Sequence, residues 1–175
     1  MKAYLGIDVG GKGFITLRNP NGLFEFKSID NSTPAELNMF LSSAKQQYGD
    51  DLFCAMEEVH AIFGSSAKAT FAFGEINGLL KGLLIANRIP FSLVQPKIWQ
   101  KEIWNNQDIV VEYKKVTVKG VEQTRKEVNT KQTSFNAAQR IFPEIDLRKT
   151  ERCKKLDDNK CDSLLICEYA RRKNL

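Results

Sequence analysis

MKAYLGIDVGGKGFITL, residues 1–17, is the stretch that decides how the rest of the chain is interpreted. Ala3–Val9 is an apolar run that contains one acid, Asp8, and a turn with three glycines follows at once. A buried strand that ends on a carboxylate beside backbone without side chains is suited to bring a charged group close. Two chemistries begin in this way, phosphate binding by nucleotide-dependent kinases and metal-dependent cleavage of phosphodiesters. The remaining sequence has to distinguish them.

Two more strand-like runs follow, Phe14–Arg18 and Leu23–Phe26, joined by Asn19-Pro20-Asn21-Gly22, which is a strong hairpin signal. Together with Ala3–Val9 they predict an antiparallel meander. A helix is predicted next, because Thr33-Pro34-Ala35-Glu36 combines a capping box with proline at the first helical position. Gly49 ends this helix.

The rest of the chain alternates between strands and helices. We expect strands at Leu52–Val59 and Phe91–Val94, and helices at 67–88, from Pro96, at Thr130–Ile141 and at Asn159–Arg172. A meander followed by alternating elements predicts an α/β fold, with a five-stranded mixed sheet flanked by helices. Gly74, Gly78 and Gly82 lie on one face of the 67–88 helix, which core packing or a subunit contact would explain.

Length and charge narrow the class of protein. The 175 residues predict a single domain, 1–175, in which the lysine-rich alternating segment 105–129 is a flexible basic insertion, an exposed hairpin or flap. Nine basic residues balance nine acidic ones through Gln100, whereas 17 face 12 from Lys101 onward, so the net charge of +5 lies in the second part. Such a basic half favours a polyanionic partner.

Cysteine usage and hydropathy exclude other classes. The four cysteines form no CxxC pair and the chain has one histidine, so we expect reduced, mostly buried thiols rather than a zinc site or disulfides. We expect no membrane contact, because no stretch approaches the roughly 18 to 20 apolar residues that span a bilayer. No cleavable apolar leader precedes the first strand, so an intracellular protein is expected.

Four acidic residues give the strongest functional signal. Asp8 and Glu57 close two strands that we expect to be neighbours, and ligands bind at the ends of such strands. In the last helix, Asp158 and Asp162 lie four positions apart and therefore project on one face. The sequence thus predicts that two acids at strand ends meet two acids on a helix.

Each of these acids also has a structural explanation. Asp158 could cap its helix, Asp162 could pair with Lys155 or Lys160 on the surface, and Glu57 could pair with a lysine. The convergence favours a joint role, because unpaired carboxylates repel one another and a divalent cation removes this cost. An all-oxygen ligand set favours Mg²⁺ or Mn²⁺ over zinc. Two such ions about 4 Å apart hydrolyse phosphodiesters by in-line attack of water.

Three segments carry a resemblance to a known family: GIDVGGKG (6–13), AMEEVH (55–60) and NTKQTSFNAAQRIFPEIDLRKTERCKKLDDNKCDSLLICEYARR (129–172). The chain resembles the RuvC family of Holliday junction resolvases, particularly its bacteriophage-type branch, over nearly its whole length except 105–129. The resemblance implies an RNase H-like fold and a homodimer that makes paired symmetric nicks in four-way DNA junctions. It also implies two-metal-ion hydrolysis with two Mg²⁺ or Mn²⁺ ions in each active site.

The resemblance implies roles for individual residues. Asp8, Glu57, Asp158 and Asp162 match the catalytic metal ligands, and Glu58 is a neighbour that faces the opposite side of its strand. The implied DNA-binding residues are Lys131, Lys154 and Lys155 for phosphate contacts, and His60 and Phe63 for stacking near the junction centre. For these five the ordinary alternatives are a solvated charged face and a core aromatic.

The last acidic motif departs from the family pattern. Phage-type relatives commonly have His-Asp-Gly there, whereas this chain has Asp157-Asp158-Asn159. The change leaves open any proton-transfer role at that position, and it leaves open whether Asp157 binds metal in place of Asp158.

Three other classes of protein share part of the signal. Actin-, hexokinase- and Hsp70-like ATPases begin with a similar strand but enclose nucleotide between two such domains, so no nucleotide cofactor is expected in a chain this short. An RNase H-like nuclease for flaps, branched DNA or RNA/DNA hybrids is the alternative, because fold does not decide substrate. A non-catalytic junction-binding protein is disfavoured, because acids facing DNA weaken binding unless metal occupies them. The expected location is the cytoplasm, that of a bacterial host if the chain is phage-encoded.

Overall fold

The computed structural model describes residues 2–59, 66–118 and 121–175, with the backbone alone for 116–118 and 121. Its strands are β1 (Ala3–Asp8), β2 (Phe14–Arg18), β3 (Phe24–Ser28), β4 (Leu52–Glu57), β5 (Phe91–Val94), β6 (Val111–Val118) and β7 (Val121–Val128). Its α-helices are α1 (Pro34–Tyr48), α2 (Ala67–Ala86), α3 (Pro96–Ile103), α4 (Thr130–Ile141) and α5 (Asp158–Lys173), and short 3₁₀ turns occupy Gly49–Asp51 and Asn106–Asp108.

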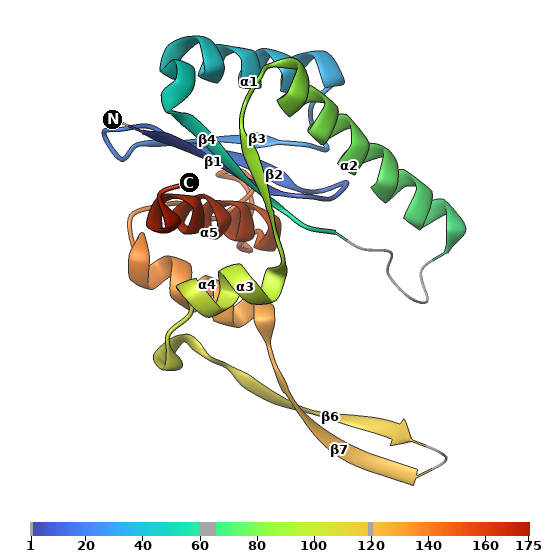
Figure 1. The fold of residues 1–175 in the computed structure, drawn as a ribbon. Helices are drawn as coiled ribbons and strands as arrows, with labels where there is room; N and C mark the ends of the chain where they lie inside the picture. The colour runs from blue at the N-terminus through green and yellow to red at the C-terminus, as the bar shows by residue number, and fades with distance from the viewer. Residues whose placement is uncertain (1, 60–65, 119–120) are drawn as a thin grey trace.

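A five-stranded mixed sheet forms the centre of the molecule, in the order β3-β2-β1-β4-β5. The β1–β2 and β2–β3 pairs are antiparallel, and β4 is parallel to both β1 and β5. Helices α1 and α2 cover one face, while α5 lies on the other face with α3 and α4 packed beyond it (Figure 1). The predicted α/β fold with a meander followed by parallel strands is therefore confirmed.

Strand alternation gives the two faces of the sheet different cores. In β1, Leu5 and Ile7 belong to the cluster under α1 and α2, whereas Tyr4 belongs to the cluster under α5. Asp8 lies an even number of residues from Tyr4 and so shares the α5 face. The same alternation in β4 places Ala55 and Glu57 on the α5 face.

One glycine sets the distance between α5 and the sheet. A Cβ atom on Gly6 would lie 2.2 Å from the backbone nitrogen of Cys167 and 2.3 Å from the carbonyl oxygen of Ser163. Helix α5 therefore rests directly on the backbone of β1, and no larger residue fits there. A buried hydrogen bond of 2.7 Å between the hydroxyls of Thr16 and Ser163 ties the helix to β2 as well.

The predicted element bounds are close to the observed ones. Phe14–Arg18, Phe91–Val94 and Thr130–Ile141 have the expected limits, whereas the third strand begins at Phe24 instead of Leu23. The amide of Leu23 binds the side chain of Asn19, 2.9 Å away, so this residue belongs to the turn. The last helix begins one residue earlier than expected, at Asp158.

Two antiparallel strands, β6 and β7, form a second sheet that is separate from the first. This hairpin occupies most of the 105–129 segment and projects from the body beyond α3 and α4 (Figure 1). All eight cross-strand pairs are formed, from Val111 opposite Val128 to Val118 opposite Val121.

Helix α2 overturns one expectation. Its 20 residues are long and apolar enough to cross a membrane by length and composition alone, contrary to the expectation that no stretch approaches this limit. The helix nevertheless docks on the sheet, because Leu80 and Leu84 are fully buried in the core shared with α1. Much of its other surface is exposed and apolar, including Phe71 and Ile85, which are 69% and 66% exposed.

Candidate metal centre

Asp8 and Glu57 lie side by side at the ends of parallel strands. The preceding residues, Ile7 and Met56, are directly paired in the β1–β4 register, so the two acids occupy equivalent positions one residue further on. Both belong to the α5 face of the sheet, and Asp8 is only 8% exposed. The sheet thus provides two carboxylates at one edge, as the sequence predicted.

The N-terminal part of α5 supplies the other two acids. Asp157 is the N-cap, and its Oδ1 accepts a hydrogen bond of 3.0 Å from the backbone nitrogen of Lys160. Asp158 and Asp162 are then four residues apart within the helix, on the side where α5 meets the sheet edge. The possible capping role of Asp158 therefore falls to Asp157, whose carboxylate is already used by the helix.

The pKa values show that the four acids share one electrostatic environment. Burial and the charges of Asp162, Glu57 and Asp158 raise the pKa of Asp8 well above its usual range. Burial, together with the charges of Glu57 and Asp158, raises the pKa of Asp162 to about 7, against a hydrogen bond from Ser134 that lowers it. The ends of β1 and β4 and the N-terminal part of α5 therefore lie close enough for the charges of these acids to interact.

Two neighbouring groups each bind one carboxylate of this cluster. The indole Nε1 of Trp99, on α3, donates to Oε1 of Glu57 at 3.0 Å, while burial raises the pKa of that carboxyl. Lys131, near the start of α4, forms an ion pair with Asp158, and this hydrogen bond raises the pKa of the lysine. The suggested pairing of Glu57 with a lysine is therefore replaced by an indole partner.

One atom of the cluster has no partner. Oδ1 of Asp162 is fully buried and accepts no hydrogen bond from any described residue. The suggested ion pairs of Asp162 do not form, because Lys160 donates to the carbonyl of Arg148 at 2.9 Å and lies over the ring of Phe26. A buried carboxylate oxygen left without a donor is a position that a cation would satisfy.

The donor chemistry fits a hard divalent cation, since every candidate ligand is a carboxylate oxygen. The orphaned Oδ1 of Asp162 agrees with this, and so do the burial and mutual repulsion that raise the pKa of Asp8. Across residues 2–59, 66–118 and 121–175, no three acidic, histidine or cysteine side chains stand in a ready ligating arrangement. With Asp158 turned to Lys131 and Glu57 to Trp99, the carboxylates point to local donors instead of a common centre.

The expected DNA-binding residues are distributed unevenly. Lys131 lies at the acidic cluster and its side chain is 71% exposed. Lys154 and Lys155 are exposed in the connector that leads to α5. His60 and Phe63 lie outside the described residues.

Sequence reasoning missed two members of the site. Trp99 is fully buried on a short helix and reads as an ordinary core aromatic, although its indole nitrogen holds Glu57. Ser134 is buried on α4 and contributes a hydrogen bond to Asp162. Neither contact has a local signal, because each joins elements that are distant in sequence.

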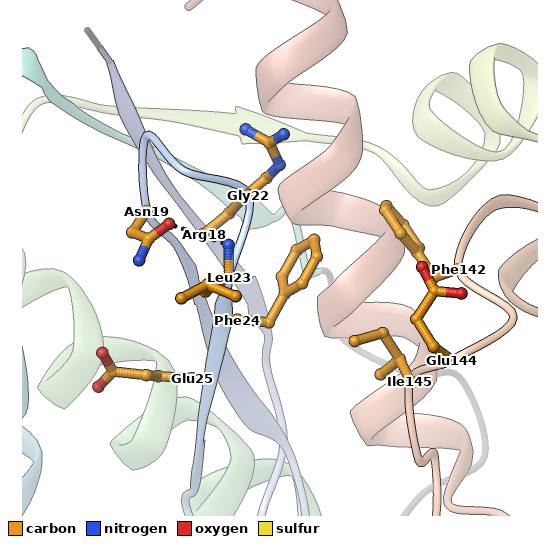
Figure 2. Close-up of a pocket in the computed structure, with 9 residues that line it drawn as sticks. All are labelled: Arg18, Asn19, Gly22, Leu23, Phe24, Glu25, Phe142, Glu144 and Ile145. Atoms are coloured by element: carbon orange, nitrogen blue, oxygen red, sulfur yellow. Dashed lines mark hydrogen bonds between the residues drawn. The ribbon is translucent and has the colours of Figure 1, made fainter.

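A cleft of about 690 Å³ lies away from the acids (Figure 2). It is formed by the β2–β3 turn and the segment after α4, with Phe24 facing Phe142 across it at a ring-centroid distance of 5.0 Å. Arg18 also lines the cleft. In the β1–β2 register it lies opposite Tyr4, at the other end of β1 from Asp8. This cleft is therefore not part of the acidic site.

This chain is similar to known proteins in its fold and not in its sequence. No protein-family model and no curated protein matches the sequence. Among solved structures, RuvC of T. thermophilus in complex with a Holliday junction substrate has a TM-score of 0.55 at 10% identity, over 99% of this chain and 96% of that one. The fold is that of RuvC. Another structure of Thermus thermophilus RuvC has a TM-score of 0.49 at 12% identity, over 98% and 96% of the two chains.

The RuvC fold confirms the RNase H-like architecture that the sequence resemblance implied. The similarity covers 99% of this chain, and the acidic cluster lies at the C-terminal ends of the central strands β1 and β4. At 10% identity the bacteriophage-type branch and the roles of individual residues stay predictions.

Proposed function

We propose that this protein is a divalent-metal-dependent endonuclease that resolves four-way DNA junctions by paired symmetric nicks. One observation carries the proposal: in a RuvC fold, burial and the charges of Asp162, Glu57 and Asp158 together raise the pKa of Asp8. Acids crowded in this way repel one another in the folded chain. They would hinder DNA binding unless cations neutralised them.

Each residue of the centre has a defined part. Bound Mg²⁺ or Mn²⁺, two ions per site, would supply activated water and neutralise the phosphate oxygens. Asp8, Glu57, Asp158 and Asp162 are the ligands, and the indole of Trp99 orients Glu57 through a bond of 3.0 Å. Lys131 holds an exposed ammonium beside Asp158, where it can contact a phosphate of the strand to be cut.

Paired nicks require two centres, so we infer a homodimer. The exposed apolar side of α2 is the surface that fits a second copy, because a Cβ on Gly74, Gly78 or Gly82 would meet nothing within 4 Å. Phe71 and Ile85 flank this glycine row with large exposed side chains. A partner helix covering them would remove this apolar surface from water without a membrane, in a protein acting on DNA in the cytoplasm.

The decisive experiment compares substrates. Synthetic four-way junctions, flaps, RNA/DNA hybrids and linear duplex are incubated with the protein in Mg²⁺, and the cut strands are mapped. We expect junctions to be cut fastest, at symmetric positions on opposing strands. Equal cutting of junctions and linear duplex would reject the resolvase, and preferred cutting of flaps or hybrids would favour an RNase H-like nuclease instead.

Asp8→Asn and Asp162→Asn test the centre itself. Both substitutions keep the side-chain volume but weaken a cation ligand, so cutting should fall at least about 1000-fold while junction binding stays within a few-fold. Asp50→Asn is the control, because Asp50 is an exposed acid whose ion pair with Lys45 lies away from the cluster. Turnover retained by either of the first two variants would remove that residue from the centre.

A further inference from the structure

The β6–β7 hairpin has two faces that differ in their charge pairing. Residues directly opposite in the register share a face, so Tyr113 and Lys115 lie with Lys126 and Thr124 on one side, here called the cationic face. Lys114 and Arg125 lie on the other side, here called the paired face, together with Glu112 and Glu127. The two faces carry similar numbers of basic residues but different numbers of acids.

On the paired face the acids neutralise the bases. Nζ of Lys114 lies 2.8 Å from Glu112 and 3.3 Å from Glu127, and Nε of Arg125 lies 3.6 Å from Glu127. Both cations of the paired face are therefore engaged in ion pairs within the hairpin. The paired face therefore offers little net charge to a ligand.

The cationic face lacks such pairing. Neither Lys115 nor Lys126 has an ion-pair partner within the described part of the chain, and both are exposed. Tyr113 stands opposite Lys126, and its side chain is 69% exposed. The one acid on this face, Glu122, lies nearer the turn.

The root of the hairpin is fixed to the helix that carries Lys131. Asp108, only 2% exposed, accepts hydrogen bonds of 2.9 and 2.7 Å from Arg140 of α4. The amide of Val110 donates to Thr133 of α4 at 3.1 Å. Asn129, directly after β7, caps α4 and also donates to Glu112 at 3.2 Å.

This anchoring sets the root of the hairpin next to the acidic cluster. Only Asn129 and Thr130 separate β7 from Lys131, which is bonded to Asp158. In Figure 1 the hairpin projects toward the side of the molecule at which β4 ends. Strands of eight residues extend about 26 Å at roughly 3.3 Å per residue, enough to follow seven or eight base pairs.

We propose that the β6–β7 hairpin is a duplex-binding arm that lays its cationic face, Tyr113, Lys115 and Lys126, on one arm of the DNA substrate. The inference rests on the proposed function, since it names how a DNA substrate is held beside the acidic cluster. A two-stranded antiparallel ribbon fits the major groove of B-form DNA. Lysine and tyrosine side chains contact phosphates there without reading sequence.

A pair of double variants tests the face. Lys115→Ala/Lys126→Ala removes two cations from the cationic face, and Lys114→Ala/Arg125→Ala removes two from the paired face with the same change in net charge. Binding to a four-way junction and to a 20-base-pair duplex is measured in chelator across a salt series. Unchanged thermal midpoints show that both variants fold, because all four side chains are exposed.

We expect the cationic-face variant to bind both DNAs about 10-fold more weakly, and its salt slope to fall by roughly 1.8, as for two lost phosphate contacts. The paired-face variant should stay within about two-fold of the wild type. Tyr113→Ala should weaken binding about three-fold.

Each outcome bears on one of the two proposals. Equal weakening by both double variants, or by neither while the wild type cuts junctions, overturns the hairpin inference and leaves the proposed function standing. Face-selective weakening in a protein that cuts no branched DNA supports the hairpin as a duplex-binding arm and rejects the resolvase. A wild type that binds neither DNA overturns both.

Discussion

At Asp162, burial and neighbouring charge act in the same direction on one carboxyl. Burial, then the charges of Glu57 and Asp158, raise its pKa to about 7 from an ordinary value of 3.8. The folded chain therefore keeps a proton that the unfolded chain has released between about pH 4 and pH 7, so stability falls as pH rises through this window. We expect the thermal midpoint of the metal-free protein to be lower at about pH 8 than at about pH 5.

Asp162→Asn is the control for this pH dependence. An amide cannot ionise, so the variant should lose much less stability between the two pH values, and thermal melts in chelator measure the difference. Adding Mg²⁺ should raise the wild-type midpoint more at the higher pH, because a cation binds the ionised carboxylates. Parallel pH curves for wild type and variant would contradict the assignment.

Trp99 gives a second prediction at the scale of the residue. Trp99→Phe keeps a buried ring but removes the donor that holds Oε1 of Glu57 at 3.0 Å. Because partners of this kind commonly change metal affinity 10- to 100-fold, the Mg²⁺ concentration for half-maximal cutting should rise about 10-fold. Trp104→Phe, which removes an indole nitrogen without a partner among the described residues, should leave that concentration unchanged.

At the scale of the element, the contact between β1 and α5 depends on Gly6, which has no side chain. Gly6→Ala would place a methyl group 2.2 Å from a backbone atom of α5, so the helix must move or the sheet must deform. We expect a loss of about 3 kcal/mol or more in the free energy of unfolding. Gly11→Ala is the matched control, since its Cβ would meet only Ile76 at an ordinary 3.7 Å and should cost less than about 0.5 kcal/mol. Urea unfolding of both variants measures the difference.

How much of the molecule is predictable also varies by element. The ends of β2, β5 and α4 follow from local turn and capping signals, so the sequence predicts them correctly. The contact of Trp99 with Glu57 and the orphaned Oδ1 of Asp162 arise only when α3, α5 and the sheet have packed. The capping role of Asp157 is local, but three consecutive polar residues offer competing caps and the sequence does not choose among them.

Helix α2 is a second case in which the sequence does not predict the packing. Its glycine spacing predicts a face for close packing, and that face is open in the single chain. The expectation that no stretch approaches bilayer length was wrong for this helix. What covers an apolar face depends on partners, which no pattern within one chain specifies.

At the scale of the whole molecule, the expected dimer gives a sharp test. A side chain at Gly78 meets nothing within 4 Å in the single chain, so Gly78→Glu should fold normally but place a charge in the contact between copies. We expect the wild type to sediment as a dimer at micromolar concentration and the variant as a monomer that no longer makes paired nicks. Glu75→Gln, an exposed change on the same helix, should remain dimeric. A monomeric wild type would refute this prediction.

The neighbouring positions of β1 and α5 have a consequence for biosynthesis. More than 150 residues separate Asp8 from Asp162, and Lys2 donates to the carbonyls of Asn174 and Leu175 at 3.1 and 3.0 Å. At about 5 to 20 residues per second, a ribosome needs roughly 10 to 30 s between the two acids. A nascent or truncated polypeptide that stops before α5 therefore carries only half of the proposed ligands, so the proposed cutting activity requires translation of this region to be complete.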